Sequence, residues 1–504
     1  ANGDALQAAE QAVELSAGES QHEVAVTVSQ PRPWNLDDPF LYRVSASLRV
    51  DAKTVHQSSI RCGFRDFRVV DGYFQLNGKR IFLKSTHTGN CMPVGLVAPV
   101  MPVLTRLDMI YAKASGFNTV RFISGTAYPE QLDFCDELGL MVYEECLAGW
   151  CLENSPKMGE RFDRNTSDMV RRDRNHPSVT IWGLLNETGD GPVFRRAVEF
   201  LPKLRKLDQT RLVLLSSGRW DAQPTIGSVS NPGGAEWEPV WGVEGTNAPK
   251  VRGQIGGGYV DRAGDAHMYP STPHDANTYR RIREFGLDTK PVFLSEYGIG
   301  SMMNVISEWR HFEQIGARPD LMDAAMLRAQ SEGLCADWKR LGFDDVYPFP
   351  EDLLRESQRL HSRQRTLGFD IVRSNPKLCG YNLTGMVDHA ITGEGLWTFW
   401  REWKPGTFDA VADGWSSLRW CLLADPLHGY TGRTMTVEAV LATEDAMKPG
   451  EYPVRFRIFG AKGVVWEKAT TLKIPDQAPM AVPAIRETIK ADFPAGKYIF
   501  AANM

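Results

Sequence analysis

The sequence has no run of 18 apolar residues, so no segment of it predicts a helix that spans a bilayer. Its formal net charge is −5, from 57 basic and 62 acidic residues, which argues against nucleic acid or an anionic membrane as a partner. What remains is an ordinary globular composition, 42% hydrophobic and 24% charged, over 504 residues. A chain of this length has room for more than one domain.

Cysteine is also scarce, with eight residues and no C-x-x-C pair, and no paired Cys/His spacing indicates a zinc site. Cys135, Cys146, Cys379 and Cys421 lie in apolar segments that read as strands or helices. That context favours buried free thiols over disulfide bonds, which stay open as the alternative.

The two ends of the chain give no information on its compartment. The first residue is Ala1 rather than Met, and residues 497–504 read as the middle of a strand, so both ends look cut. The lack of a signal peptide therefore leaves a periplasmic or secreted and a cytoplasmic location, of bacterial type, equally open.

The most informative stretch is residues 174–187, which read R-N-H-P-S-V-T-I-W-G-L-L-N-E. An Asn-His-Pro turn precedes the apolar, β-rich run 179–185, and the polar residues Asn186 and Glu187 follow it. In α/β barrels the parallel strands are continuous apolar runs, and the active site lies at their carboxyl ends. The stretch therefore predicts a buried strand that presents an amide and a carboxylate to a catalytic face.

A second strand pattern, P-V-F-L-S-E-Y-G at residues 291–298, presents Glu296 in the same way. Two facing carboxyl groups are what glycoside hydrolysis needs: one protonates the departing oxygen, and the other attacks the anomeric carbon or activates water. For either glutamate alone, an ion-pair or supporting role is the alternative. The matched pair, with Asn186 beside Glu187, favours catalysis.

These two stretches resemble the acid/base and nucleophile segments of glycoside hydrolase family 2. Three further segments fit the family pattern in the right order: residues 71–84, 118–121 and 135–145. The resemblance implies a retaining β-glycosidase with Glu296 as the nucleophile and Glu187 as the acid/base. It implies no cofactor, and no essential metal, because the metal ligands of some family galactosidases have no counterpart here.

The other predicted site residues would bind the sugar or hold the carboxylates. Asn186 resembles the family's amide that hydrogen-bonds the sugar 2-hydroxyl, Arg121 would pair with Glu296 and lower its pKa, and Tyr269 would donate a hydrogen bond to Glu296. The remaining predicted substrate-binding residues are His87, Glu145, His267, Trp397, Trp400 and Trp403. The tryptophans would stack on sugar rings, although core packing would claim at least one of them, and His267 has a core role as its alternative.

Strand and helix patterns alternate through the middle of the chain. Eight strand patterns begin near residues 81, 119, 140, 179, 212, 265, 292 and 380, and helical patterns include residues 103–115, 130–138, 192–207 and 279–285. This alternation predicts a closed parallel barrel with right-handed crossovers. A further helical region, residues 320–375, would form a lid or an outer buttress. The Gly- and Pro-rich stretch 222–260 would shape the substrate pocket with Trp237 and Trp241, unless these tryptophans pack the loop against the barrel.

The expected fold is multidomain, α/β plus all-β, with a (β/α)8 TIM barrel at residues 71–428. An immunoglobulin-like β-sandwich at residues 1–70 and a second β-sandwich at residues 429–504 would flank it, both incomplete. Turn-bounded strand patterns support the flanking domains, at residues 23–28, 41–50 and 61–70 and at residues 435–441, 452–459 and 464–474.

Departures from the family pattern leave the sugar open. Thr384 stands where strand eight usually has Trp, and the Asn-x-Lys signature for glucuronides is not evident at residues 392–394, although Lys404 or Arg401 could still meet a carboxylate. We expect a retaining exo-β-glycosidase of galactosidase type acting on a carbohydrate or glycoconjugate, with β-glucuronidase or β-mannosidase as the alternative. A carbohydrate-binding barrel without catalysis is the alternative of another class, and a homo-oligomer stays open.

Overall fold

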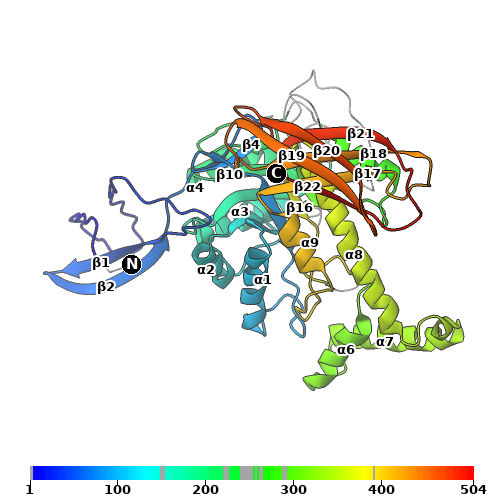
Figure 1. The fold of residues 1–504 in the computed structure, drawn as a ribbon. Coiled ribbons are helices and arrows are strands. Elements are labelled where there is room, and N and C mark those ends of the chain that lie inside the picture. The colour runs from blue at the N-terminus through cyan, green and yellow to red at the C-terminus, as the bar shows by residue number, and fades with distance from the viewer. Residues whose placement is uncertain are drawn as a thin grey trace.

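The computed structural model of the protein describes residues 4–147, 154–218, 226–238, 254–255, 258–259, 265–286, 292–389 and 392–504. A central barrel carries a pair of sheets formed by the C-terminal residues, and a hairpin near the N-terminus and a group of helices project from it (Figure 1). The barrel positions the predicted site, and the other parts either close it or extend from it.

Eight parallel strands form the barrel, and all eight predicted strands are confirmed. They are β6 (Leu83–Thr88), β7 (Thr119–Phe122), β8 (Met141–Glu145), β9 (Val179–Asn186), β10 (Leu212–Ser217), β14 (Asp265–Met268), β15 (Val292–Tyr297) and β16 (Leu378–Leu383). Hydrogen bonds join them in the order β10-β9-β8-β7-β6-β16-β15-β14. Every residue of these strands is buried, as expected of parallel strands covered on both faces.

The first and last strands of this series, β10 and β14, meet through polar contacts. The Ser217 hydroxyl lies 2.9 Å from Nε2 of His267, and the backbone N–H of Gly218 donates to Oδ2 of Asp265 at 3.1 Å. A short strand, β11 (Val229–Ser230), pairs antiparallel with β10. The carboxyl end of β10 therefore lies beside β14, and the side chain of His267 is held next to Ser217.

The predicted helices are present as α1 (Pro102–Ala114), α2 (Pro129–Leu138), α4 (Pro192–Leu207) and α5 (Ala276–Glu284). Proline in the first turn of α1, α2 and α4 fixes φ where a backbone donor is not needed. The predicted alternation also leaves room for a helix between the strands near residues 140 and 179, and α3 (Met158–Asp173) occupies that place. Its buried side includes Phe162 and Val170 beside the polar Thr166 and Asp173.

The amino-terminal end of the barrel is covered by a small antiparallel sheet of β3 (Phe67–Val70), β4 (Tyr73–Leu76) and β5 (Lys79–Arg80). Phe67 and Phe74 pack with Leu83, Ile181 and Phe293, which lie toward the starts of their strands. This end is therefore filled by apolar side chains, and the carboxyl ends of the strands remain for the site.

The immunoglobulin-like sandwich expected in residues 1–70 stays a prediction, and of its three expected strand segments the first is not a strand. Residues 23–28 form no strand, and β1 (Tyr42–Val50) and β2 (Lys53–Cys62) pair only with each other in a hairpin that stands away from the barrel (Figure 1). Both faces of the hairpin are exposed, including Val44 and Val55. Alternating residues identify a strand, but they do not supply the second sheet that a sandwich needs to bury its apolar face.

The C-terminal residues form the second predicted sandwich, seen in orange and red in Figure 1. One sheet contains β17 (Leu418–Asp425), β18 (Thr434–Thr443) and β21 (Ala481–Lys490), and the other contains β20 (Gly463–Ile474), β19 (Gly450–Gly460) and β22 (Ile499–Asn503). Leu441, Phe456 and Leu472 share the core between them. Because β17 belongs to the first sheet, the sandwich begins before residue 429, where the sequence analysis placed the boundary.

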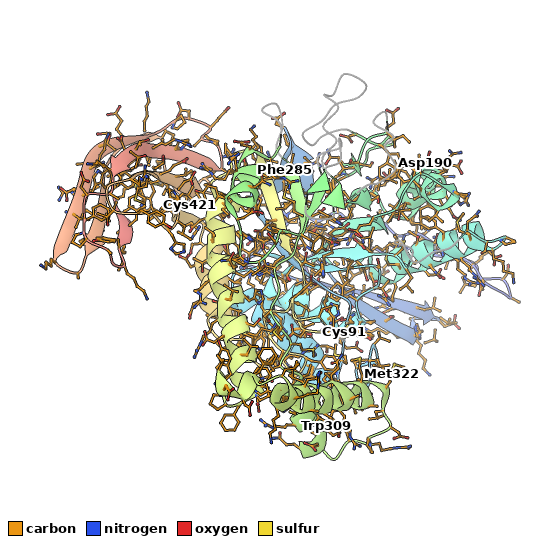
Figure 2. The ribbon with its side chains drawn as sticks, turned by 90° about the vertical axis from the view of Figure 1, so that its right-hand side faces the viewer. Cys91, Asp190, Phe285, Trp309, Met322 and Cys421 are labelled. Atoms are coloured by element: carbon orange, nitrogen blue, oxygen red, sulfur yellow. The ribbon has the colours of Figure 1, made fainter. Side chains whose placement is uncertain are left out.

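The predicted helical region 320–375 is confirmed as α7 (Met322–Arg340) and α8 (Pro350–Arg373). Phe369 and Ile371 of α8 belong to the barrel core, so α8 is an outer buttress. Its other end reaches α7 and α6 (Val305–Gln314), near the labelled Trp309 and Met322 (Figure 2). There the backbone N–H of Val94 donates to Asp323 of α7 at 2.7 Å, which holds the loop after β6.

The interpretation of the cysteines is confirmed, since Cys135, Cys146, Cys379 and Cys421 are buried and free. Cys421 lies where the sandwich meets the helices of the barrel (Figure 2) and packs with Val440 and Ala442. Within the described residues, no helix is both long enough and apolar enough to cross a membrane.

Candidate active site

The strands β9, β14 and β15 bring their polar residues together at the carboxyl end of the barrel. Glu187 directly follows β9, and its φ of 46° lies in the left-handed region that a residue with a side chain rarely adopts. The backbone N–H of Glu187 donates to the carbonyl of Ser217 at 2.7 Å, which fixes this turn to the end of β10. The turn presents the Glu187 carboxylate toward β14 rather than along the strand.

His267 lies between the two predicted catalytic carboxylates. Its Nδ1 atom is 2.6 Å from Oε1 of Glu187 and 3.3 Å from Oε2 of Glu296. One side-chain atom of each of these three residues lies within 4.8 Å of the others. That spacing corresponds to the roughly 5 Å between carboxyl groups of retaining glycosidases and is shorter than the roughly 6.5–9.5 Å of inverting ones.

Arg121, at the end region of β7, joins the nucleophile candidate to its neighbours. Its guanidinium is fully buried and donates to Glu296 at 3.0 Å, to Oδ1 of Asn186 at 2.6 Å and to Glu145 at 2.7 Å. The predicted contact of Arg121 with Glu296 is therefore present. Glu145 also accepts the backbone N–H of Ser124 at 2.7 Å, so both of its oxygens are engaged and it holds Arg121 in place.

Neighbouring charges shift the pKa values of Glu296 and His267 in opposite directions. Burial alone would raise the pKa of Glu296, but the positive charges of His267 and Arg121 outweigh it and hold that pKa below its usual range. Burial lowers the pKa of His267, but the charge of Glu296 and the hydrogen bond with Glu187 outweigh it and raise the net value. The arrangement is therefore an ionised Glu296 beside a protonated imidazole.

Tyr269 donates its phenolic O–H to Oε2 of Glu296, as the sequence analysis predicted. Burial and the charge of Glu296 raise the pKa of Tyr269, so the phenol keeps its proton and remains a donor. Glu296 thus receives donors on both oxygens, from Arg121 on one and from Tyr269 on the other. A carboxylate held in this way has a fixed orientation.

His87 lies on β6, and its Nδ1 atom is 3.3 Å from the side-chain amide nitrogen of Asn382 on β16. Burial lowers the pKa of His87 to about 3, so its imidazole is neutral. In the part of the chain that the structure describes, Oδ1 of Asn382 is buried without a hydrogen-bond partner. Asn382 is therefore a polar group of the barrel interior that the sequence analysis missed.

Ser217 and Asp265 were also missed, although both lie on barrel strands. Ser217 ends β10 and contacts His267, and Asp265 begins β14 and accepts a hydrogen bond from the Ser295 hydroxyl, next to Glu296. The rule that found Asn186 and Glu187, a polar residue at the end of an apolar strand, would also have found Ser217. No such rule covers Asp265, because it stands at the start of its strand.

The three predicted stacking tryptophans pack against other aromatic side chains, which gives no support to their assignment to sugar subsites. Trp397 is 0% exposed, donates its indole N–H to Asp108 at 3.0 Å and packs against Trp403 at 4.9 Å between ring centroids, so for Trp397 the prediction is wrong. Trp403 also packs on Tyr111 of α1. Trp400 contacts Phe312 of α6. Core packing, the alternative that the sequence left open, describes these aromatic residues.

Neither Lys404 nor Arg401 is free to meet a substrate carboxylate. The Lys404 ammonium is fully buried and donates to Asp388 at 2.7 Å, to the Gly393 carbonyl at 2.8 Å and to the Ser301 hydroxyl at 3.0 Å. Arg401 pairs with Asp108 at 2.7 Å. Their protein partners therefore give no support to the possibility that either residue recognises a uronic acid.

The long stretch 222–260 is described only in part. Trp237 donates its indole N–H to the carbonyl of Val198 on α4 at 3.0 Å and packs against the barrel core, so it holds the loop to the barrel. Trp241 lies outside the described residues.

Glu187, His267 and Glu296 carry atoms of the kind that bind a divalent metal. A metal ligand must be a neutral imidazole, however, and the two carboxylates favour the protonated form of His267. The absence of an essential metal stays a prediction. A second group, Asp133, Asp136 and His176, is already engaged, since Asp136 contacts His176 at 2.7 Å and Asp133 pairs with Arg61.

The fold and this geometry define a (β/α)8-barrel protein with two carboxylates facing each other at the carboxyl ends of its strands. Residues 67–327 match the model of the glycosyl hydrolases family 2 TIM barrel domain, and residues 2–65 match a further model of glycosyl hydrolases family 2. The chain belongs to glycoside hydrolase family 2.

Individual relatives share only part of their length with this chain. A β-galactosidase of Photobacterium profundum is 33% identical over 177 residues, 32% of this chain and 17% of the relative. A putative β-glucuronidase of Formosa agariphila is 34% identical over 165 residues, 32% of this chain and 19% of the relative. The curated relatives are thus matched over about a fifth of their length.

Solved structures extend the similarity of fold to almost the whole chain. The β-D-mannosidase of Dictyoglomus thermophilum superposes with a TM-score of 0.63 at 17% identity, over 95% of this chain and 56% of that one. A family 2 β-galacturonidase of Eisenbergiella tayi gives 0.51 at 19% identity, over 77% and 60%. The chain spans about half the length of these neighbours.

Proposed function

We propose that the chain is a retaining exo-β-glycosidase that hydrolyses a terminal β-linked sugar by double displacement, with Glu296 as nucleophile and Glu187 as acid/base. The observation that supports this proposal is the close pair of carboxylates at the carboxyl end of a family 2 barrel. An oxygen atom of Glu187, one of Glu296 and a ring nitrogen of His267 all lie within 4.8 Å of one another. A barrel that only bound carbohydrate would need neither a matched pair nor donors on both oxygens of one member.

In the first step Glu296 attacks the anomeric carbon while Glu187 gives a proton to the departing glycosidic oxygen. The lowered pKa of Glu296 keeps it ionised for this attack. Arg121 and Tyr269 hold its two oxygens, and Asn186, itself fixed by Arg121, meets the sugar 2-hydroxyl as positive charge develops on the ring. The products are a glycosyl ester on Glu296 and the free alcohol.

In the second step Glu187, now ionised, takes a proton from water, and the water oxygen attacks the anomeric carbon and releases Glu296. His267 Nδ1, 2.6 Å from Glu187, stabilises the carboxylate of Glu187 between the two steps. Two inversions at one carbon return the β-configuration, so the released sugar is first the β-anomer.

We propose a galactosidase-type substrate, supported by the relative from Photobacterium profundum and by the engagement of Lys404 and Arg401 with other partners. The experiment is a panel of nitrophenyl β-galactoside, glucuronide, mannoside, glucoside and xyloside, with proton NMR on the released sugar. Fastest release from the galactoside, with the β-anomer first, supports the proposal. Release of the α-anomer first, or no turnover of any glycoside by folded protein, would contradict it.

A further inference from the structure

Glu394 follows β16 and lies against the backbone that continues from the nucleophile candidate. A β-carbon added to Gly298 would be 3.5 Å from Oε1 of Glu394 and 2.3 Å from Cδ1 of Tyr269. A β-carbon added to Gly300 would be 3.5 Å from Cγ of Glu394. Glycines at these two positions therefore let the Glu394 side chain lie beside Tyr269, the donor to Glu296.

The Glu394 carboxylate is half-buried and, among the residues that the structure describes, engages no hydrogen-bond donor or salt-bridge partner. The nearby cations are already occupied. Arg365 donates to the Ile299 carbonyl at 2.6 Å and to the Tyr381 hydroxyl at 3.1 Å, and Lys404 pairs with Asp388. A carboxylate taken partly out of water without a donor is costly, so this one is suited to receive a donor from a ligand.

Glu394 and Asn186 approach the site from different strands. Asn186 ends β9, whereas Glu394 lies against Gly298 and Gly300, which follow β15, a strand that is not paired with β9. In a pyranose ring, C2 and the ring oxygen lie on opposite sides of the anomeric carbon. If Asn186 meets the substituent on C2, the substituent on C5 extends toward Glu394.

We propose that Glu394 is a specificity-determining residue of the proposed glycosidase: its carboxylate accepts a hydrogen bond from the hydroxymethyl group of a neutral hexose, and its charge excludes the corresponding uronic acid. The inference rests on the proposed function and deepens it. Burial raises the pKa of Glu394. The negative charges of Glu296 and Asp388 add to this effect, and the positive charge of Arg365 opposes it. A substrate carboxylate would add a further negative charge near Glu296 and Asp388, and Arg365 and Lys404, the cations that act on Glu394, already have protein partners.

The test compares three nitrophenyl substrates: the neutral hexoside that the wild type cleaves fastest, its 6-deoxy analogue and its uronide. We expect Glu394→Ala to lower kcat/KM for the hexoside about 10- to 100-fold, the range for loss of a hydrogen bond to a charged group. The 6-deoxy analogue lacks the hydroxyl, so its kcat/KM should change by no more than about threefold. Glu394→Gln should raise the uronide's kcat/KM relative to that of the hexoside.

Glu402→Ala is the matched control, because Glu402 lies on the same segment, is half-exposed and contacts only His311 through its carboxylate. It should leave all three values unchanged. An equal loss on hexoside and 6-deoxy analogue would overturn the inference, as would a wild type that prefers the uronide, and either result leaves the glycosidase proposal standing. A folded wild type that cleaves no glycoside overturns the proposed function and the inference together.

Discussion

Glu187 and Glu296 are the same amino acid, and their surroundings differ in ways that suit the two roles proposed for them. The side chain of Glu296 is 3% exposed and receives donors from Arg121 and Tyr269, whereas that of Glu187 is 20% exposed and contacts His267. A nucleophile must be ionised and fixed, while an acid/base must reach both the leaving group and water. Exposure and the number of donors both support the proposal that Glu296 is the nucleophile.

Removing each carboxylate should therefore have a different consequence. In Glu187→Ala the loss of general acid/base catalysis should lower kcat about 10²- to 10⁴-fold, and azide, which needs no base, should restore turnover of an activated aryl glycoside. The product should be the β-glycosyl azide, because azide attacks the intermediate on Glu296.

The matched variant is Glu296→Ala, which removes the nucleophile instead. No intermediate can form, so azide attacks the substrate directly and the product should be the α-glycosyl azide. Product analysis by proton NMR separates the two anomers. If the two variants gave the opposite pattern, the roles of Glu187 and Glu296 would be reversed.

His267→Gln should move the acid limb of the pH profile. The reaction needs ionised Glu296, so kcat/KM rises as the pH passes its pKa, and His267 is one of two positive charges that lower this pKa. Without that charge the effect of burial is less opposed, and the limb should shift to higher pH by about one unit. His311→Gln, on α6, is the control. A limb that stayed in place or moved to lower pH would contradict the argument.

Among single residues, the sequence was enough to identify those whose role follows from a position at the end of a strand. Asn186, Glu187 and Glu296 could be found because a polar residue after an apolar strand is informative without a structure. Glu145 and the tryptophans could not be assigned, because a residue's partners decide its role: Glu145 has both oxygens engaged by Arg121 and Ser124, and Trp397 has no exposed surface.

At the scale of elements, α6 carries a carboxylate that makes stability depend on pH. Glu308 is 1% exposed, and burial together with the charges of Asp388 and Glu402 raises its pKa to about 8. An unfolded glutamate has a pKa of about 4.3, so between that value and about 8 the folded state holds a proton that the unfolded state has lost. The contribution is therefore favourable at low pH and is lost as the pH rises through this window.

Glu308→Gln should remove that dependence, because glutamine is neutral at every pH. Between pH 5 and pH 9 the wild type should lose stability on the order of a few kcal/mol relative to the variant. Denaturant unfolding at both pH values measures the difference. Glu313→Gln, an exposed position on the same helix, is the control and should follow the wild type. Equal pH dependence in Glu308→Gln and the wild type would show that Glu308 does not titrate in this range.

The elements themselves were largely predictable where their residues repeat with one period. All eight barrel strands were found, most clearly where the run is apolar, as in β9, whereas β6 (Leu83–Thr88) is buried but mostly polar. The helix α3 occupies the place that the predicted alternation leaves between two strands, although Thr166 and Asp173 are buried on its inner side. The strand β1 matches the segment expected at residues 41–50, but β2 (Lys53–Cys62) was not predicted, and no local pattern states which other sheet a strand packs against.

At the scale of the whole molecule, buried ion pairs join the barrel to the C-terminal sandwich. Glu444, directly after β18, accepts from Lys84 of β6 at 3.0 Å and from Arg373 of α8 at 2.8 Å. Arg283 of α5 pairs with Glu438 of β18 at 2.6 Å. These partners are far apart in sequence and carry no local signal, so the sequence analysis placed a boundary at residue 429 without predicting this contact. The pairs make the sandwich part of the barrel's stability.

Glu444→Ala tests this coupling, because it leaves Lys84 and Arg373 buried without a carboxylate. Breaking a buried ion pair on one side costs about 3–5 kcal/mol, so the free energy of unfolding should fall by about that amount. Glu467→Ala breaks an exposed pair with Arg457 inside the sandwich and should cost no more than about 1 kcal/mol. Lys84 lies near the start of β6, at the end of the barrel away from Glu187, so kcat/KM at 25 °C should be unchanged in both variants. An equal effect of the two substitutions on unfolding would mean that the sandwich does not stabilise the barrel through Glu444.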